Sequence, residues 1–148
     1  MFNLTSSLLY DQTTFYNAFL RDLRIAKTLV IIESPFITKK RMDLLMPALS
    51  KLRSKGVRVI VNTKPFREHD LSYQSQAMWA VQVMQDLGIE VLMTGGHHRK
   101  LAIIDNDILW EGSLNILSQN DSCELMRRIN SAIAVKEMLR FTGIEKWC

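Results

Sequence analysis

The chain has 148 residues and a formal net charge of +4, with 47% hydrophobic and 23% charged residues. This composition argues against a disordered, collagen-like or disulfide-stapled chain, so we treat residues 1–148 as a single globular domain. No segment approaches the ~20 apolar residues of a membrane span. With no signal-peptide pattern and only two cysteines, we expect a cytoplasmic protein with no membrane association.

The first part of the chain alternates between helical and strand patterns. Apolar residues at helical spacing predict three helices, at 12–26, 39–55 and 73–87. Continuous apolar runs predict three buried strands, at 29–32, 57–61 and 89–93. Pro47 lies inside the second helix and predicts either a kink or a restart one turn later. This order indicates an α/β sheet with parallel pairs.

The pattern changes after Gly95-Gly96. Residues 98–104 and 108–111 predict two strands joined by a turn at Asp105-Asn106-Asp107. The end of the chain predicts a further strand at 124–129 and a closing helix at 131–142.

The residues whose side chains are best suited to catalysis lie in and after this hairpin. His98, Lys100, Asp105 and then Gly112-Ser113-Leu114-Asn115 follow the order H-x-K-x4-D-x6-G-S-x-N. Residues at i and i+2 of a strand share a face, so His98 and Lys100 should point the same way. An imidazole nucleophile with cationic and neutral hydrogen-bond donors suits attack on a phosphodiester, and no metal-ligand cluster accompanies it.

Other residues are expected to support this group. A nucleophilic His98 needs an acceptor on its second ring nitrogen, and Glu124 and Asp121 are the two candidates. Asp105 lies at the turn, which predicts support of the hairpin rather than contact with phosphate. Glycines at 95, 96 and 112 are expected to let the backbone approach a phosphate closely.

The order and spacing of the motif resemble the signature of the phospholipase D superfamily. The resemblance covers nearly the whole chain, from the strand that ends in Glu33-Ser34-Pro35-Phe36 to the motif itself. It implies an α/β, phospholipase D-like half-domain: a mixed sheet with a parallel core, flanked by helices on both faces. An acidic residue shortly after the G-S-x-N asparagine is usual in the superfamily, which favours Glu124 over Asp121.

The resemblance also implies a mechanism without a metal or other cofactor. His98 would attack phosphorus to form a phosphohistidine, with Lys100, Ser113 and Asn115 binding the phosphate oxygens. Because the motif occurs once, the resemblance implies a homodimer whose active site lies at the two-fold axis. The two copies of His98 would divide the roles of nucleophile and general acid.

We expect the substrate to be nucleic acid, with DNA favoured over RNA, and the activity to be that of an endonuclease. No sequence-reading module is recognisable, so a helicase or restriction-system partner would supply target choice. One alternative is a phospholipase or phosphatidyl transferase, which an apolar aromatic and methionine rim around His98 would favour. Another is a catalytically inactive nucleic-acid-binding or dimerisation module, with His98 buried or self-paired.

The remaining histidines and arginines carry weaker signals. His97 does not fit the lysine spacing, and His69 is a lone loop histidine, so neither is assigned a role. Arg127 and Arg128 either line a phosphate path or serve solvent and salt bridges.

Overall fold

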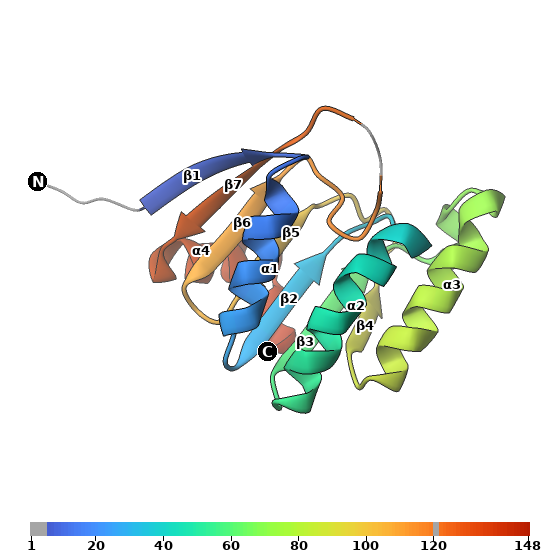
Figure 1. Ribbon diagram of the computed structural model, residues 1–148, viewed down its shortest axis with the longest axis horizontal. Coiled ribbons are helices and arrows are strands. Elements are labelled where there is room, and N and C mark those ends of the chain that lie inside the picture. Colours follow the sequence, from blue (N-terminus) through green and yellow to red (C-terminus); the bar gives the residue numbers. More distant parts are fainter. Residues whose placement is uncertain (1–5, 120–121) are drawn as a thin grey trace, which may run out of the picture.

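The computed structural model describes residues 6–119 and 122–148, which form a seven-stranded sheet with helices on both faces (Figure 1). The spatial order of the strands is β1-β7-β6-β5-β2-β3-β4. Their bounds are β1 Ser6–Asp11, β2 Leu29–Glu33, β3 Arg58–Thr63, β4 Glu90–Met93, β5 Leu101–Ile104, β6 Ile108–Gly112 and β7 Leu125–Asn130. Strands β2, β3 and β4 pair in parallel and the other pairs are antiparallel. The predicted mixed sheet with a parallel core is confirmed.

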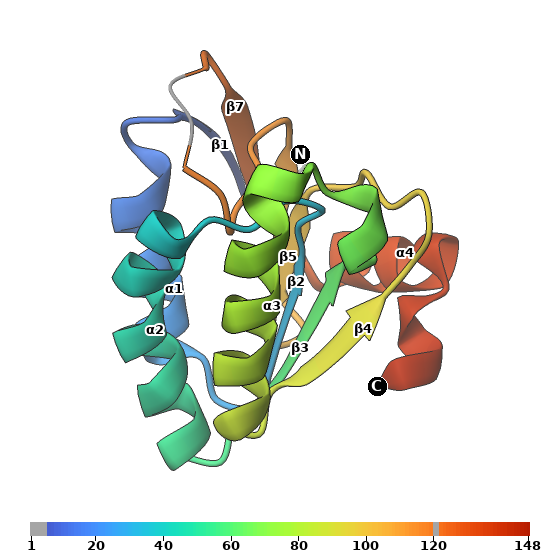
Figure 2. The ribbon, with the colours of Figure 1, turned by 90° about the vertical axis from the view of Figure 1, so that its right-hand side faces the viewer.

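The helices divide unevenly between the two faces of the sheet. Their bounds are α1 Phe15–Ile25, α2 Lys39–Ser54, α3 Leu71–Asp86 and α4 Ala132–Thr142, with 3₁₀ turns at Phe66–Glu68 and Ile144–Trp147. Figure 2 shows α1, α2 and α3 on one face and α4 on the other. All four predicted helices are present, and Pro47 lies within an uninterrupted α2. Strand β1 was not predicted, because its apolar run, Leu8-Leu9-Tyr10, is only three residues long.

The central strands are apolar on both faces because both faces are covered. In β2, Val30 and Ile32 pack into the large cluster beneath α1, α2 and α3, whereas Ile31 packs with Val135 and Ile144 on the α4 side. Burying a side chain of this size stabilises the fold by roughly 1.5–3 kcal/mol. The uninterrupted apolar runs therefore follow from the layer architecture.

One polar group is built into the larger cluster. The indole of Trp110 donates a hydrogen bond of 2.8 Å to Asp22, and Arg128 forms an ion pair of 2.8 Å with the same carboxylate. Arg128 therefore fastens β7 to α1 instead of lining a phosphate path.

One predicted strand begins later than expected. We predicted a strand over residues 98–104, but β5 begins at Leu101, so His98 and Lys100 precede it. The topology explains the difference. Strand β4 lies at the sheet edge, and the chain must cross the ends of β3 and β2 before it can pair as β5. Residues 94–100 make this crossing and are left outside the strands.

The strand directions bring the polar residues of the motif to one edge of the sheet. Parallel strands β2, β3 and β4 end at this edge, and β5, antiparallel to β2, begins there. Strand β6 ends and β7 begins at the same edge. The crossing segment, the G-S-x-N turn and the start of β7 thus lie together, as in other α/β sheets that place sites beyond the carboxyl ends of their strands.

Candidate active site

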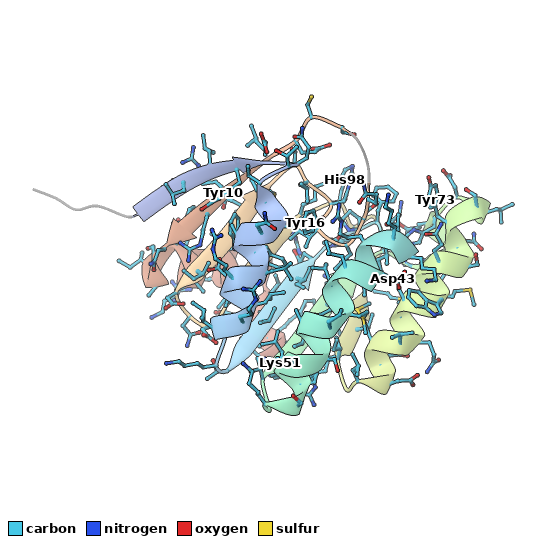
Figure 3. The ribbon with its side chains drawn as sticks, viewed as in Figure 1. Tyr10, Tyr16, Asp43, Lys51, Tyr73 and His98 are labelled. Carbon is cyan, nitrogen blue, oxygen red and sulfur yellow. The ribbon has the colours of Figure 1, made fainter. Side chains whose placement is uncertain are left out.

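His98 and Lys100 line an open groove at this edge, and Figure 3 labels His98 there. His98 is exposed and Lys100 is half-buried. The Lys100 ammonium lies 2.5 Å from His98 Nδ1 and donates to the His98 carbonyl at 2.8 Å. Burial lowers the pKa of Lys100, and the Glu124 carboxylate opposes this shift. The groove has a volume of about 660 Å³, and its walls are His98, Arg99, Lys100, Leu101, Glu111, Gly112, Ser113, Asn115, Glu124, Met138, Phe141 and Thr142.

The lysine contact determines the protonation pattern of the imidazole. A charged Lys100 donates to Nδ1, so the proton of a neutral ring resides on Nε2. No hydrogen bond among the described residues involves Nε2, which is left for a ligand. In this arrangement His98 is a proton donor, and a nucleophilic Nε2 requires the proton to move to Nδ1.

Ser113 and Gly112 fix the turn between β6 and β7. The Ser113 hydroxyl accepts a hydrogen bond from the Leu125 backbone N–H at 3.1 Å and lies 3.4 Å from the Leu125 carbonyl. A Cβ at Gly112 would lie 2.2 Å from that same carbonyl oxygen, so only glycine fits. We expected Gly112 to admit a phosphate, but the close approach that requires glycine is to the backbone of β7.

Asn115 lies where the turn leaves the sheet, and the segment behind it is firmly held. Its side-chain oxygen is buried and has no hydrogen-bond partner among the described residues. The Tyr16 hydroxyl donates to the Ile116 carbonyl at 2.6 Å, and the Leu117 N–H donates to the Ser34 hydroxyl at 3.1 Å. The sequence analysis missed Tyr16 and Ser34 because their partners are distant in the chain.

Glu124 lines the groove, but its predicted contact with His98 is not formed. Its backbone N–H is held by the Gln12 side chain at 2.9 Å, and its carboxylate acts electrostatically on Lys100. Among the described contacts, none joins Glu124 to the imidazole. The competing candidate, Asp121, lies outside the described residues. The role of Glu124 stays a prediction.

A buried network behind the groove was also missed. Glu33, fully buried at the end of β2, accepts two hydrogen bonds from Arg99, at 2.8 and 3.2 Å. Asn62 donates to the same carboxylate at 2.8 Å and accepts from Thr94 at 2.9 Å. Hydrogen bonding to Glu33 raises the pKa of Arg99. The network fastens the crossing segment to β2 and β3, and it engages the Arg99 guanidinium although Arg99 also lines the groove.

The remaining histidines stay without a chemical role. His97 is buried beside the Glu33 network, and burial lowers its pKa. His69 is also buried, edge-on to Phe36 at 6.1 Å between ring centroids, and burial lowers its pKa as well.

Asp105 lies at the other end of β5, away from the groove. It has a positive φ of 55°. Its carboxylate accepts hydrogen bonds from the backbone N–H groups of Lys27, Thr28 and Leu29, at 2.8 to 3.2 Å. Burial acts to raise the pKa of Asp105, but these hydrogen bonds outweigh it and the pKa is lowered. Through these contacts Asp105 anchors the start of β2, and its supporting role stays a prediction.

The described residues include no group of three or more His, Cys, Asp or Glu side chains that could hold a metal ion. Cys123 and Cys148 are both free and exposed. In the described part of the chain, no helix has the length and apolar character of a membrane span.

Comparisons with known proteins give a matching family model and solved structures with a similar fold. A family model described as cardiolipin synthase, PLD-like domain, matches residues 19–142. The fold is similar to that of a phospholipase D family member, Nuc from Salmonella typhimurium, with a TM-score of 0.76 and 18% identity, over 93% of this chain and 91% of that chain. For NucT from Helicobacter pylori the TM-score is 0.71 and the identity 20%, over 93% of each chain.

A longer protein shares the fold as well. The phosphatidylserine synthase of Haemophilus influenzae Rd KW20 matches with a TM-score of 0.69 and 13% identity, over 93% of this chain but 38% of that chain. None of the curated proteins compared with the chain matches it significantly. At these identities the structural matches establish the fold alone.

Proposed function

Because the chain belongs to the phospholipase D-like family, we propose that it hydrolyses phosphodiesters and that it is an endonuclease acting on DNA, or less favourably on RNA. The observation that carries this proposal is the groove at His98. There an exposed imidazole with Nε2 open to a ligand lies beside the Lys100 ammonium, and Ser113 and Asn115 line the same groove. The alternative of a catalytically inactive module required a buried or self-paired His98, and the exposed imidazole disfavours that alternative.

The proposed reaction has two steps and uses the protein's own side chains. His98 Nε2 attacks phosphorus, an N–P bond forms, and the bond between phosphorus and the leaving oxygen breaks. His98 of the partner subunit gives its proton to that oxygen. Water then attacks phosphorus, the N–P bond breaks and frees His98, and the partner's His98 takes the proton from the water. Lys100, Ser113 and Asn115 stabilise the charge on the phosphate oxygens without a metal ion.

The nucleophilic step requires a rearrangement that the groove permits. While Lys100 donates to Nδ1, the imidazole proton is on Nε2 and the nitrogen cannot attack. An arriving phosphate attracts the ammonium away from the ring. The exposed Nε2 gives its proton to solvent, and Nδ1 takes one up. Glu124, which lines the same groove, then accepts a hydrogen bond from Nδ1, and Nε2 has a free lone pair. We therefore propose that Glu124 orients His98 only when substrate is bound.

The proposed homodimer explains an exposed apolar surface next to the groove. Phe141 and Ile133 on α4 are 87% and 82% exposed, and Leu125 at the start of β7 is 56% exposed. Phe141 and Met138 also form one wall of the His98 groove. A second copy seated on this surface would bury these side chains and bring its own His98 near the groove. A two-fold interface pairs one patch with itself, which suits this arrangement.

A substitution on α4 tests the dimer. Phe141→Glu should convert the protein to a monomer in analytical ultracentrifugation at micromolar concentration and reduce cleavage at least tenfold, since central aromatic contacts dominate interfaces. Leu71→Glu, at an equally exposed apolar position on α3, is the control and should leave both properties unchanged. A monomeric wild type that retains activity would rule out the shared site.

The choice of nucleic acid rests on charge and size. The chain carries a net charge of +4, and phosphate contacts dominate binding to nucleic acid. The match with this chain covers almost the full length of Nuc and NucT but only 38% of the length of the phosphatidylserine synthase. A helicase or restriction-system partner stays a prediction that nothing in the structure tests.

The deciding experiment is cleavage of labelled plasmid and single-stranded DNA in excess EDTA. We expect wild-type protein to cut and His98→Asn to lose at least roughly a thousandfold in rate. Equal cleavage by both proteins would identify a contaminant. Activity that the chelator abolishes would contradict the metal-independent mechanism.

One observation favours a second candidate, a phospholipase or phosphatidyl transferase. Met138 and Phe141 form an apolar wall of the groove, as such an activity requires. The description of the matching family model also names cardiolipin synthase. Phosphatidylglycerol vesicles should therefore be assayed beside DNA. Release of glycerol with no cleavage of DNA would replace the nuclease by the lipid enzyme.

A further inference from the structure

A second hollow adjoins the catalytic groove on the side of α2 and α3. Its volume is about 260 Å³, and its walls are Phe36, Ile37, Thr38, Asp70, Tyr73, Asn115, Ser118 and Gln119. Asn115 lines both this hollow and the His98 groove. Figure 3 shows Tyr73 and His98 at the same edge of the molecule. A chain bound at His98 can therefore continue past Asn115 into the hollow.

The walls of the hollow combine aromatic rings with uncharged polar groups and one carboxylate. Tyr73 is 44% exposed, and Phe36 is half-buried. Asp70 is exposed and precedes α3, yet its side chain makes no capping hydrogen bond to that helix. Among the described residues, no lysine or arginine lines the hollow. A phosphate would meet a carboxylate there without a cation, whereas a planar base would meet two aromatic side chains and several hydrogen-bonding groups.

The polar wall is held in one arrangement. The Gln119 N–H donates to the Thr38 hydroxyl at 2.8 Å, and Arg41 donates to the Gln119 side-chain oxygen at 2.5 Å. Arg41 is itself stacked on Tyr16, 3.6 Å from the ring centroid. Because the Gln119 oxygen is engaged, its amide NH₂ is the group left to donate to a ligand. The hollow thus has a fixed donor in Gln119 and an uncommitted acceptor in Asp70.

The size of the hollow also fits one base. Pockets for drug-sized ligands have volumes of roughly 300–1,000 Å³, and this one is smaller. Beside it, the Lys64 ammonium lies 3.9 Å from the centroid of Phe36, where it can reach the sugar-phosphate backbone of a nucleotide seated against that ring.

We propose that the hollow binds one unpaired nucleobase, that of a nucleotide flanking the scissile phosphate. The inference rests on the proposed nuclease function and deepens it: a base can enter the hollow only when it is unpaired, either in a single strand or flipped out of a duplex. Tyr73 stacks on the base. The Asp70 carboxylate accepts a hydrogen bond from an exocyclic amino group, so cytosine, adenine and guanine bind better than thymine or uracil.

Binding to short oligonucleotides tests the proposal independently of cleavage. Fluorescence anisotropy with the uncleaving His98→Asn protein should show that labelled oligo-dC binds at least fivefold more tightly than oligo-dT, since of these two pyrimidines only cytosine carries an exocyclic amino group. Asp70→Asn in this background should reduce the preference below twofold, since an amide both donates and accepts. Asparagine also serves well at a position before a helix, so α3 is preserved.

The stacking contact has its own variant. Tyr73→Ala should weaken binding of both oligonucleotides by roughly 5- to 100-fold, the effect of losing one base-stacking contact. Tyr73→Phe should retain most of the affinity. Leu71→Ala, on the same helix but not in the wall of the hollow, should have no effect. Equal binding of the two oligonucleotides, or a Tyr73→Ala protein that binds as before, would overturn the subsite.

Kinetics with two substrates separate the subsite from the function. Wild-type protein should cleave both oligo-dC and bis(p-nitrophenyl) phosphate, a small diester that does not extend into the hollow. Tyr73→Ala should lower the ratio of kcat/KM for the oligonucleotide to that for the small diester by the same 5- to 100-fold. An equal fall for both substrates would contradict the subsite. Wild type that cleaves neither substrate would overturn the proposed function, and the binding measurements would still decide the subsite.

Discussion

Three consecutive residues, His98, Arg99 and Lys100, belong to two polar clusters of opposite character. Arg99 joins Glu33 and Asn62, and the fully buried Glu33 carboxylate receives three hydrogen bonds. His98 and Lys100 join an open groove where the imidazole is exposed and Nε2 has no partner among the described residues. The first cluster is complete without a ligand and the second is not. Completeness of hydrogen bonding therefore distinguishes the structural cluster from the one that we propose to be reactive.

The contrast arises from the topology of the crossing segment. Residues 94–100 run across the ends of β3 and β2 outside the strands. Backbone hydrogen bonds attach Thr94 to Thr63 and Lys100 to Gly112, and side chains attach the residues between them. Arg99 provides this attachment by reaching Glu33 on β2. With Arg99 fixed, its two neighbours are left open to the groove. The arginine, which lies between the two motif residues, thus positions both of them.

A substitution of Lys100 should reduce activity strongly while changing stability little. Lys100→Met removes the cation that we propose to stabilise phosphate charge, and we expect kcat/KM to fall by roughly 10²–10⁴. Among the described residues the ammonium bonds only to His98, so the free energy of unfolding should change by less than about 1 kcal/mol. Urea denaturation and DNA cleavage on the same preparation measure both. A strongly destabilised variant would mean that Lys100 belongs to the structural cluster.

Arg99 should show the opposite behaviour. Arg99→Met leaves the buried Glu33 carboxylate with Asn62 alone, at an expected cost of about 2–4 kcal/mol in stability. The lower part of this range is favoured because the Arg99 side chain is 46% exposed and solvent screens the pair. Urea denaturation of Arg99→Met, Glu33→Gln and the double variant measures the coupling. If the effects of the single variants simply add, the pair contributes no coupling energy and the structural assignment of Arg99 fails.

The fold was largely predictable because its determinants are local or repeated. Buried strands such as Leu29–Glu33 appear as apolar runs, and α2 appears as a helical pattern despite Pro47. The exposed strand β1 and the start of β5 were not predictable in this way. Whether residues 98–100 pair as a strand depends on the position of β4 in the sheet order, which no local pattern records.

The site was predictable to the extent that the motif is contiguous. His98, Lys100, Ser113, Asn115 and Glu124 do line one groove. Their supports come from distant parts of the chain: Tyr16 reaches the Ile116 carbonyl, and Glu33 reaches Arg99. Such pairs have no fixed spacing, so only the folded chain reveals them. The contact of Lys100 with Nδ1 likewise depends on side-chain geometry rather than on sequence order.

A substitution of Asp105 tests whether a partly buried carboxylate with protein hydrogen-bond partners stabilises the fold in the same way as the fully buried Glu33 carboxylate. Its carboxylate accepts hydrogen bonds from three backbone N–H groups at the start of β2. Asp105→Asn keeps the shape of the side chain, and asparagine tolerates the positive φ. We expect a loss of about 1 kcal/mol at pH 6, modest because the group is only partly buried.

The pH dependence of that loss identifies its origin. The pKa of Asp105 is lowered from its ordinary value of 3.8 in the folded protein, so its contribution is complete above 3.8 and is lost as the pH falls through the lowered folded value. The difference in unfolding free energy between wild type and Asp105→Asn, measured in urea from pH 6 downward, should therefore shrink below pH 3.8. Other lowered carboxyl groups, such as Glu90, contribute equally to both proteins and cancel. A difference that stays constant with pH would assign the effect to the geometry of the side chain, and the charge on Asp105 would then play no part in holding β5 to β2.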